Sequence, residues 1–384
     1  MSQAEGVARK LRVAVLNRVF SPAGGGAESY SIRIVEQLAA RHDVHVFAQR
    51  IEHQWPGVSY HHVPCPLTRP RWINQLWYAL HTWRATRRGF DVVHSHENTW
   101  HGRVQTIHVK PVRTNLLAGR SGWQLVARWL KIVLSPRLVT NLGLEAARFR
   151  RRPGRHVALA SEALRAQALA AYPAAAAMMS VITPGVNLPG ETPARSEVRR
   201  LLDLPQSGAL LLFVANDYAR KGLDALLAAL ARLPEGVMLI VVGNPAGIPQ
   251  YRDKARSRGL AQRVHFLGAM KDLDLAYRAA NVLVHPTLDD TFAMVVLEAM
   301  AYGLPVVVSG PAHCGISAML QDGCNAVLLE DPRNDGQLAA AVSRILSDAA
   351  LAAKLSEGGR RFAQEHTWEE AAREYEALYF ASLD

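Results

Sequence analysis

Aliphatic, strand-like segments alternate with helix-forming segments along almost the whole chain, and this alternation restricts the fold more than any other feature. In the first half we expect strands near residues 11–17, 44–48, 58–63, 91–95, 103–108 and 156–160. In the second half we expect them near 209–215, 237–242, 263–267, 281–285, 305–308 and 325–328. Such alternation is typical of parallel sheets with helices on both faces, so the expected class is α/β.

The length of 384 residues predicts two domains, because it exceeds what one hydrophobic core usually supports. Pro and Gly cluster at 184–193, which marks a boundary. We expect a Rossmann-like domain at 1–185, a second at 186–366, and a helix at 367–384. In doubly wound sheets, ligands bind at the carboxyl ends of the strands, so two such domains facing each other would hold a site in the cleft between them.

Several protein classes are disfavoured by composition. Cys65, Cys314 and Cys324 lack the spacing of a disulfide framework or a zinc site. The N-terminus MSQAEGVARK runs straight into a strand-like segment without the apolar core of a signal peptide, and no run of 18 apolar residues is present. We therefore expect a globular protein of the cytoplasm.

The net charge of +11 is unevenly distributed. Residues 1–185 carry 25 Lys and Arg against 9 Asp and Glu, whereas residues 186–384 carry 19 against 24. No acidic residue occurs between Glu97 and Glu145, and this span includes GWQLVARWLKIVL, which reads as a basic amphipathic helix with Trp at its edge. Such a helix fits an anionic membrane surface, although an ordinary packed helix with a cationic rim is the alternative. The residues proposed for that surface are Lys110, Arg113, Arg120, Trp123, Arg128, Trp129 and Lys131. A second Arg- and Trp-rich stretch occupies 69–88.

Two acids eight residues apart, Asp290 and Glu298, lie in a segment that reads strand, loop, helix, strand. We expect a helix over 291–301, which puts one carboxylate in the loop and the other on the helix that follows. Free amides of Thr291, Phe292 and Ala293 at the helix start would attract a diphosphate between the two acids. The alternative is a capping Asp and an exposed Glu.

Cations at another expected helix start support an anionic ligand. Arg220 and Lys221 follow the strand FVA and oppose the dipole of the helix they begin, which costs a few tenths of a kcal/mol unless an anion is bound. A guanidinium fork and an ammonium group would both suit a diphosphate.

The glycines of SPAGGGAES let backbone approach a ligand at a helix start, although a tight turn without a ligand is the alternative. They do not form the dinucleotide fingerprint, and the second strand ends in Gln49 and Arg50 rather than in an acid, which disfavours an oxidoreductase. A nucleic-acid-binding protein would explain the sequence pI of about 9.9, but no helix-turn-helix, RNA-binding sheet or zinc signature accompanies the charge.

The blocks ARKGLDALLAAL, VHFLGAMKDLDLAYRAANVLVHP and the segment from Asp290 to EAMAYGLPVV resemble retaining glycosyltransferases of family 4, which have the GT-B fold. With GGGAES at the front and TWEEAAREYEALY at the end, the resemblance covers nearly the whole chain, and it implies that the helix at 367–384 returns to the first domain. The family motif has Glu where Asp290 stands, one methylene longer, and Ala215 replaces a glycine that is usual after the FV strand.

This resemblance implies roles for individual residues. Asp290 would bind the donor sugar, Glu298 the ribose, and Arg220 with Lys221 the diphosphate. His108 matches a position beside the reacting carbon, although a His at a strand end is more often structural. The remaining positions implied in nucleotide-sugar binding are Gly24, Gly25, Gly26, Gly268, Ala269, Met270, Thr291, Phe292, Ala293 and Met294.

The resemblance also implies the chemistry. Within this family, the chain most resembles lipopolysaccharide core glucosyltransferases, so the expected donor is a nucleotide sugar such as UDP-glucose. The expected acceptor is a lipid-linked oligosaccharide at the inner face of the cytoplasmic membrane. Another polysaccharide or lipid acceptor is the alternative. Asp272-Leu273-Asp274 has a D-x-D form that some sugar transferases use with manganese, but at a helix start Asp is a good cap, so neither a metal nor a cofactor is expected.

Overall fold

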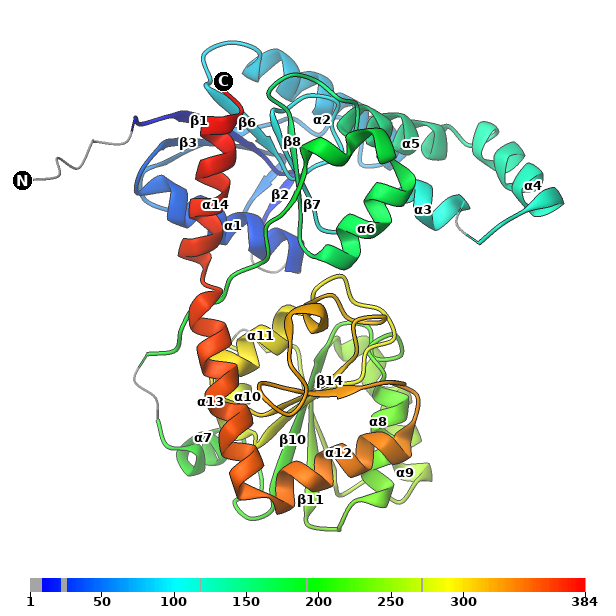
Figure 1. The fold of residues 1–384 in the computed structure, drawn as a ribbon, viewed down its shortest axis with the longest axis vertical. Helices are drawn as coiled ribbons and strands as arrows, with labels where there is room; N and C mark the ends of the chain where they lie inside the picture. Colours follow the sequence, from blue (N-terminus) through cyan, green and yellow to red (C-terminus); the bar gives the residue numbers. More distant parts are fainter. Residues whose placement is uncertain (1–8, 22–25, 118, 191–192, 271, 384) are drawn as a thin grey trace, which may run out of the picture. The chain divides into compact units, whose positions relative to one another are not determined.

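The structure is a computed structural model that describes residues 9–21, 26–117, 119–190, 193–270 and 272–383. The chain forms two compact units, residues 1–184 together with 368–384 and residues 185–367, here called unit 1 and unit 2 (Figure 1). Each unit is built on a parallel sheet with helices packed against it, so the expected α/β class with two doubly wound domains is confirmed.

Unit 1 contains a seven-stranded sheet in the order β5-β3-β1-β6-β7-β8-β9, and every neighbouring pair is parallel. These strands are β1 (Arg12–Leu16), β3 (Asp43–Ala48), β5 (Val58–His62), β6 (Val92–Ser95), β7 (Val104–Ile107), β8 (His156–Leu159) and β9 (Met179–Val181). Its helices are α1 (Gly26–Ala39), α2 (Arg71–Thr86), α3 (Val112–Leu117), α4 (Gly122–Val133), α5 (Pro136–Arg148), α6 (Glu162–Ala171) and α14 (Trp368–Ala381). A short parallel pair joins β2 (Val19–Phe20) to β4 (Arg50–Ile51).

The last helix, α14, packs on α1 and so returns to the first unit, as expected (Figure 1). Its tyrosines reach into the sheet. The hydroxyl of Tyr375 lies 2.9 Å from Thr106 Oγ1 on β7, and the hydroxyl of Tyr379 lies 2.7 Å from His94 Nδ1 on β6. Both tyrosine rings are fully buried, so α14 completes the core of unit 1.

Unit 2 contains a six-stranded parallel sheet in the order β12-β11-β10-β13-β14-β15. The strands are β10 (Ala209–Ala215), β11 (Val237–Gly243), β12 (Val264–Gly268), β13 (Val282–His285), β14 (Val306–Ser309) and β15 (Val327–Leu329). The helices are α7 (Arg195–Leu201), α8 (Leu223–Arg232), α9 (Ile248–Ser257), α10 (Asp274–Ala279), α11 (Met294–Ala301), α12 (Asp335–Ser347) and α13 (Ala349–Glu365).

Strand β10 shows why this sheet is buried on both faces. Leu210, Leu212 and Val214 point into one apolar cluster with α10 and α11, while Leu211 and Phe213 point into another with α8 and α12. Alternate side chains of a strand lie on opposite faces, so an unbroken apolar run such as ALLLFVA requires cover on both sides. The central strands are therefore rigid supports for the loops at their ends.

Candidate active site

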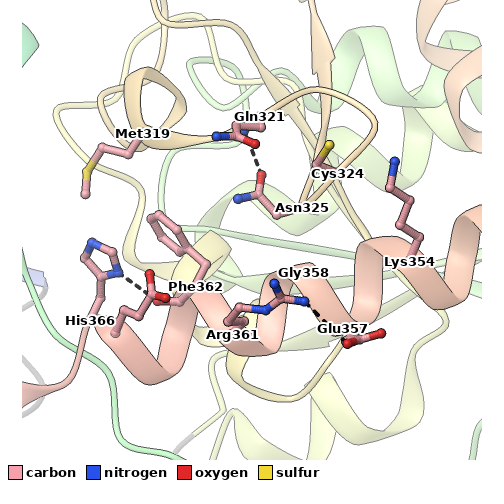
Figure 2. A pocket seen from close by; sticks show the side chains of 11 residues that line it. Met319, Gln321, Cys324, Asn325, Lys354, Glu357, Gly358, Arg361, Phe362 and His366 are labelled. Carbon is pink, nitrogen blue, oxygen red and sulfur yellow. Dashed lines mark hydrogen bonds and ion pairs between the residues drawn. The ribbon is translucent and has the colours of Figure 1, made fainter.

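A pocket of about 570 Å³ lies in unit 2 between the end of α13 and the loop at 319–325 (Figure 2). It is lined by charges of both signs, including Lys354, Glu357 and Arg361, and by none of the residues expected to bind a ligand. It lies along a helix rather than at the carboxyl ends of the strands, where doubly wound sheets hold their ligands. Strand topology therefore places the candidate site elsewhere than in this pocket.

The strand order of unit 2 reverses at β10 and β13, which are neighbours in the sheet although they are distant in sequence. The loops that leave these two strands, 216–222 and 286–293, are joined by a hydrogen bond of 2.9 Å from the amide of Leu288 to the carbonyl of Arg220. Gly222 has a φ of +84°, and a Cβ at this position would collide with the Pro286 carbonyl. Glycine therefore allows the two loops to meet at the point where ligands are expected.

An ion pair joins these loops. Lys221 Nζ lies 2.5 Å from Asp290 Oδ2 and donates a second hydrogen bond of 3.0 Å to the Asp289 carbonyl. The side chains of Lys221 and Asp290 are only 13% and 16% exposed. His285, at the end of β13, places its Nε2 3.3 Å from the same Asp290 oxygen. The structure thus brings together two of the predicted residues and adds a third, His285.

Burial of Asp290 opposes ionisation, yet the hydrogen bond from His285 and the charge of Lys221 hold the pKa of this carboxyl well below its usual range. Asp290 is therefore an anion at neutral pH. Burial lowers the pKa of His285, although its hydrogen bond to Asp290 acts in the opposite direction. The Nδ1 atom of His285 is buried and has no hydrogen-bond partner among the described residues.

The second oxygen of Asp290 accepts hydrogen bonds from the amides of Phe292 at 3.2 Å and Ala293 at 3.0 Å. The expected helix start at Thr291 is wrong, because α11 begins at Met294 and follows Ala293, whose φ is +74°. The expectation that the amides of Phe292 and Ala293 are free is also wrong, since both donate to Asp290. One carboxylate therefore holds both the loop and the cation.

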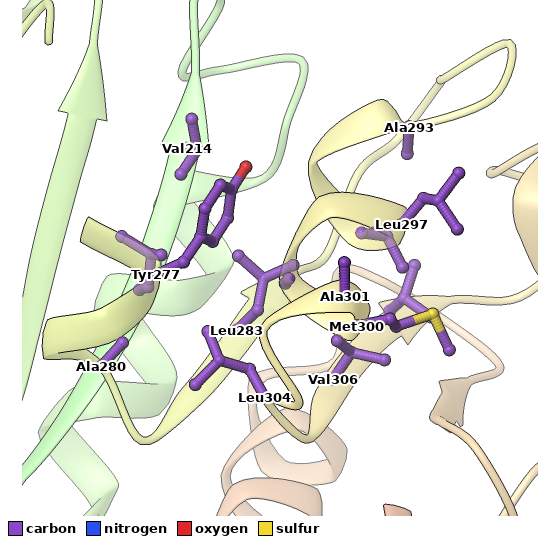
Figure 3. Packing of buried hydrophobic residues seen from close by; sticks show 14 of the residues in the cluster. Val214, Tyr277, Ala280, Leu283, Ala293, Leu297, Met300, Ala301, Leu304 and Val306 are labelled. Carbon is purple, nitrogen blue, oxygen red and sulfur yellow. The ribbon is translucent and has the colours of Figure 1, made fainter. Parts of the chain in front are cut away.

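Glu298 on α11 accepts a hydrogen bond of 2.6 Å from the hydroxyl of Tyr277 on α10. Tyr277 is 2% exposed, and its ring stacks on Tyr302 with centroids 5.3 Å apart. Figure 3 shows Tyr277 within the apolar cluster that also contains Val214 and Leu283. Burial and the neighbouring Glu298 carboxylate raise the pKa of Tyr277 well above its usual range, so its hydroxyl remains a donor. Tyr277 thus fixes one oxygen of Glu298.

The other residues expected at this site differ in how firmly they are held. The guanidinium of Arg220 is 56% exposed and pairs with Asp217 at 3.5 Å, in contrast to the mostly buried Lys221. Gly268 ends β12 with a φ of +72°, which glycine adopts readily, and as a glycine it offers only backbone atoms to a ligand. Ala269 and Met270 follow Gly268 at the same carboxyl edge of the sheet as the β10 and β13 loops.

In unit 1 the order reverses between β1 and β6, and a chain of histidines lies at this point. His96 Nδ1 lies 3.2 Å from His108 Nε2, and the two rings are stacked with an interplanar angle of 5°. His94 is held from both sides, because its Nε2 lies 2.7 Å from Thr106 Oγ1 and its Nδ1 is equally close to the Tyr379 hydroxyl. His108 is therefore part of a network rather than a lone strand-end residue.

These histidines are neutral at physiological pH. Burial lowers the pKa of His94 and of His108 to about 3, and the buried guanidinium of Arg148 acts in the same direction. The pKa of His96 is lowered well below its usual value, again mainly by burial. A neutral imidazole donates at one nitrogen and accepts at the other, so the bond between His96 and His108 couples their tautomers.

The glycine turn is only partly described. Gly24 and Gly25 lie outside the described residues, and Gly26 is the first residue of α1. Arg18, just after β1, pairs with Glu97, just after β6. Its amide and its Nε donate to the two Glu97 oxygens at 3.0 and 2.9 Å. This pair joins the segments that follow β1 and β6 at the switch point of unit 1.

Four residues at these sites escaped the sequence analysis: His285, Tyr277, His96 and Glu97. Three of them lie at or just beyond strand ends, in VLVHP and VVHSHE, which is a signal that inspection of strand termini would have used. Tyr277 gives no such signal, because its role depends on the packing of α10 against α11.

In the D-x-D segment, Asp272 Oδ1 accepts a hydrogen bond of 3.0 Å from the amide of Asp274, the first residue of α10. Within the described ranges, no three His, Cys, Asp or Glu side chains gather as a metal-ligand set would.

Helix α4 presents apolar side chains to solvent at helical spacing. Trp123 is 79% exposed, Val126 56%, Leu130 61% and Val133 67%. Among the described residues, the extensive contacts of this helix are with α3 and α5, and it projects from the rest of unit 1 (Figure 1). Over the part of the chain that the structure describes, no helix is long and apolar enough to cross a membrane.

Comparisons with known proteins agree with this geometry. Residues 194–362 match the family model described as "Glycosyl transferases group 1", and residues 24–189 match "Glycosyltransferase Family 4". A D-inositol 3-phosphate glycosyltransferase of Xylanimonas cellulosilytica is 30% identical over 312 residues, which cover 74% of this chain and 70% of that protein. The match to a relative of the same name from Salinispora tropica spans only 47% of its length.

Two solved structures show the same fold. The chain superposes on WaaG, a glycosyltransferase involved in lipopolysaccharide biosynthesis, with a TM-score of 0.80, 23% identity and coverage of 96% of this chain and 99% of that one. It superposes on Anabaena HepE in complex with UDP and glucose with a TM-score of 0.73 and 18% identity, covering 97% and 100%.

Proposed function

This chain belongs to glycosyltransferase family 4 and has the GT-B fold, and we propose that it transfers a hexose, with retention of configuration, from a nucleotide sugar to a phosphorylated glycolipid acceptor. The observation that carries the proposal is the buried pair of Lys221 and Asp290 at the switch point of unit 2, with Glu298 on the helix that follows. The donor is proposed to be UDP-glucose, and the complex of HepE with UDP and glucose supports a donor of this type.

The positions of the charged side chains support binding of such a donor. Lys221 and Arg220 would neutralise the diphosphate, and Lys221 is already fixed by Asp290. Glu298, oriented by Tyr277, would accept hydrogen bonds from the ribose hydroxyls. Asp290 already accepts two hydrogen bonds at each oxygen, so it would accept one from the sugar in place of one of these. The loop at Thr291–Met294 would lie beside the sugar, while the backbone at Gly268–Met270 would meet the base.

The reaction needs no protein nucleophile. The oxygen of the acceptor hydroxyl forms a bond to the anomeric carbon as the bond from that carbon to the diphosphate breaks, and the hydroxyl proton passes to the departing phosphate oxygen on the same face. Negative charge grows on that oxygen, where a preorganised cation such as Lys221 stabilises the transition state more than the ground state. We propose that neither a metal nor a cofactor takes part. His108, neutral because it is buried, would act through hydrogen bonding rather than charge.

For the acceptor we propose a lipopolysaccharide core or a related glycolipid at the inner face of the cytoplasmic membrane. The excess of cations in residues 1–185 and the exposed apolar face of α4 support an anionic, membrane-bound acceptor. The relatives named D-inositol 3-phosphate glycosyltransferase favour a second candidate, a soluble phosphorylated polyol.

One experiment separates these possibilities. The protein is incubated with a panel of nucleotide sugars and with either truncated lipopolysaccharide or D-inositol 3-phosphate, and the products are identified by mass spectrometry. A hexose added to the lipopolysaccharide supports the proposal, and addition only to the inositol phosphate supports the second candidate. If no nucleotide sugar raises the melting temperature and no product forms, the donor assignment is wrong.

A further inference from the structure

A second cavity, of about 620 Å³, lies entirely within unit 1 and has a lining unlike that of Figure 2. Five residues form its wall: Arg69, Pro70, Arg71, Trp72 and Arg137. Three are cations and none is an acid. From this cavity we infer that unit 1 has a binding site for a phosphorylated saccharide, which, given the proposed function, is the charged part of the acceptor.

The three arginines have no counter-ion within the described parts of the chain. No ion pair or side-chain hydrogen bond is formed by Arg69, Arg71 or Arg137 there. The sequence explains why, because residues 53–90 and 98–144, which supply both sides of the cavity, contain no Asp or Glu. Three guanidinium groups around one cavity repel one another and attract an anion. Guanidinium groups bind phosphate through two parallel hydrogen bonds, which makes a phosphate ester a suitable ligand.

The helices that carry these arginines reinforce the positive potential. Arg71 begins α2, and Arg137 is the second residue of α5. Neither helix has an acidic residue in its first turn or a side-chain cap. Cations in the first turn oppose the helix dipole, so both starts are less stable than they would be with Asp or Glu. A bound phosphate would offset this at both helices at once.

Trp72 distinguishes a sugar phosphate from a bare anion. Its indole is half-buried and lines the cavity beside the arginines. An aromatic face offers apolar surface against which the C–H side of a sugar ring can lie. A cavity of this size also exceeds what a phosphate alone would fill, so a saccharide that carries the phosphate fits both features.

The cavity is connected to the switch point of unit 1. Helices α2 and α5 pack side by side (Figure 1). Gln75 of α2 donates a hydrogen bond of 2.8 Å to the carbonyl of Asn98, and the Asn98 side chain donates one of 3.2 Å to the carbonyl of Asn141 on α5. Asn98 follows directly after Glu97 at the end of β6. A ligand in the cavity would therefore be held by elements tied to the strand end where His96 and His108 lie.

The test measures binding of glucose 6-phosphate by isothermal titration at constant ionic strength, to wild type and to the variant Arg69→Gln/Arg71→Gln/Arg137→Gln. We expect the variant to bind at least tenfold more weakly, because several charge-assisted hydrogen bonds are lost. The matched control is Arg150→Gln/Arg151→Gln/Arg152→Gln, which removes three exposed cations of the same unit that do not line the cavity. Equal affinity in wild type and cavity variant, or equal loss in the control, would overturn the inference.

Further ligands identify the source of the phosphate. Trp72→Leu should weaken the binding of glucose 6-phosphate but not that of inorganic phosphate. An equal effect on both ligands would show that the cavity does not recognise the saccharide. Flotation with phosphatidylglycerol vesicles provides the lipid comparison. If the cavity variant loses vesicle binding while it keeps its affinity for glucose 6-phosphate, the cavity binds a lipid head group and the saccharide inference is wrong.

Binding of UDP, measured on the same samples, separates this inference from the proposed function. UDP should bind all of these proteins equally, because none of the residues proposed for it is changed in these variants. Failure of UDP to bind any of them would refute the donor site. Normal UDP binding with an unchanged response to glucose 6-phosphate in the cavity variant would refute the cavity inference alone.

Discussion

Acidification should destabilise unit 1 through His94 and His108. The folded-state pKa of each is about 3, because both are buried. In the unfolded chain the pKa of a histidine is about 6.5. Below that value the unfolded chain takes up protons that the folded protein does not, so the free energy of unfolding is highest at neutral pH and falls as the pH decreases.

Integration of this difference from pH 7 to pH 5 gives a loss of roughly 2 kcal/mol for each histidine, or about 4 kcal/mol for the pair. His96 changes in the same direction. A loss of this size is a large part of the 5–15 kcal/mol that usually separates folded from unfolded domains.

Urea unfolding followed by tryptophan fluorescence reports on unit 1, where both histidines lie, because all eight tryptophans belong to unit 1. The variant His94→Gln removes one of the titrating groups. Its free energy of unfolding should fall between pH 7 and pH 5 by about 2 kcal/mol less than that of wild type, whatever its stability at pH 7. If the two proteins lose the same free energy, or if the His94 ring titrates near pH 6.5 in folded protein by NMR, the reasoning is wrong.

Four further outcomes are expected. Lys221→Ala should lower turnover roughly a hundredfold, as for loss of one preorganised electrostatic contact, and turnover within twofold of wild type would rule out a catalytic role for Lys221. Tyr277→Phe should weaken the binding of UDP roughly tenfold and that of 2′-deoxy-UDP much less, because Glu298 loses a charge-assisted hydrogen bond. Equal losses of affinity for the two ligands would argue against ribose recognition by Glu298. Activity should survive EDTA, and rescue by a divalent ion after inhibition would overturn metal independence. Trp123→Ser/Leu130→Ser should abolish flotation with anionic vesicles, and unaltered flotation would exclude α4 as the membrane contact.

Much of the fold follows from local pattern. Unbroken apolar runs such as ALLLFVA and VLVH, separated by amphipathic segments, are typical of parallel strands with helices on both faces, and such strands are found at β10 and β13. The return of the C-terminal helix to the first unit came from family resemblance, because nothing in WEEAAREYEALYFA itself says which sheet it covers.

Less of the candidate site could be predicted from the sequence. Placing Lys221 and Asp290 near one ligand was possible from strand ends, but their direct ion pair depends on β10 and β13 being neighbours. The start of α11 was misplaced because Ala293 adopts a positive φ, which is rare for a residue other than glycine and is held here by the Asp290 carboxylate. Propensity favours a helix through this segment, and tertiary contacts override it.

The position of α14 has a consequence for synthesis of the protein. On the ribosome, residues 368–384 emerge only after the whole of 185–367, whereas Tyr375 and Tyr379 complete the hydrogen bonds of Thr106 and His94. The core of unit 1 therefore stays incomplete during synthesis, while the continuous unit 2 is already able to fold. Discontinuous domains of this kind depend on late-arriving segments, so loss of the final helix would damage the part of the molecule that was made first.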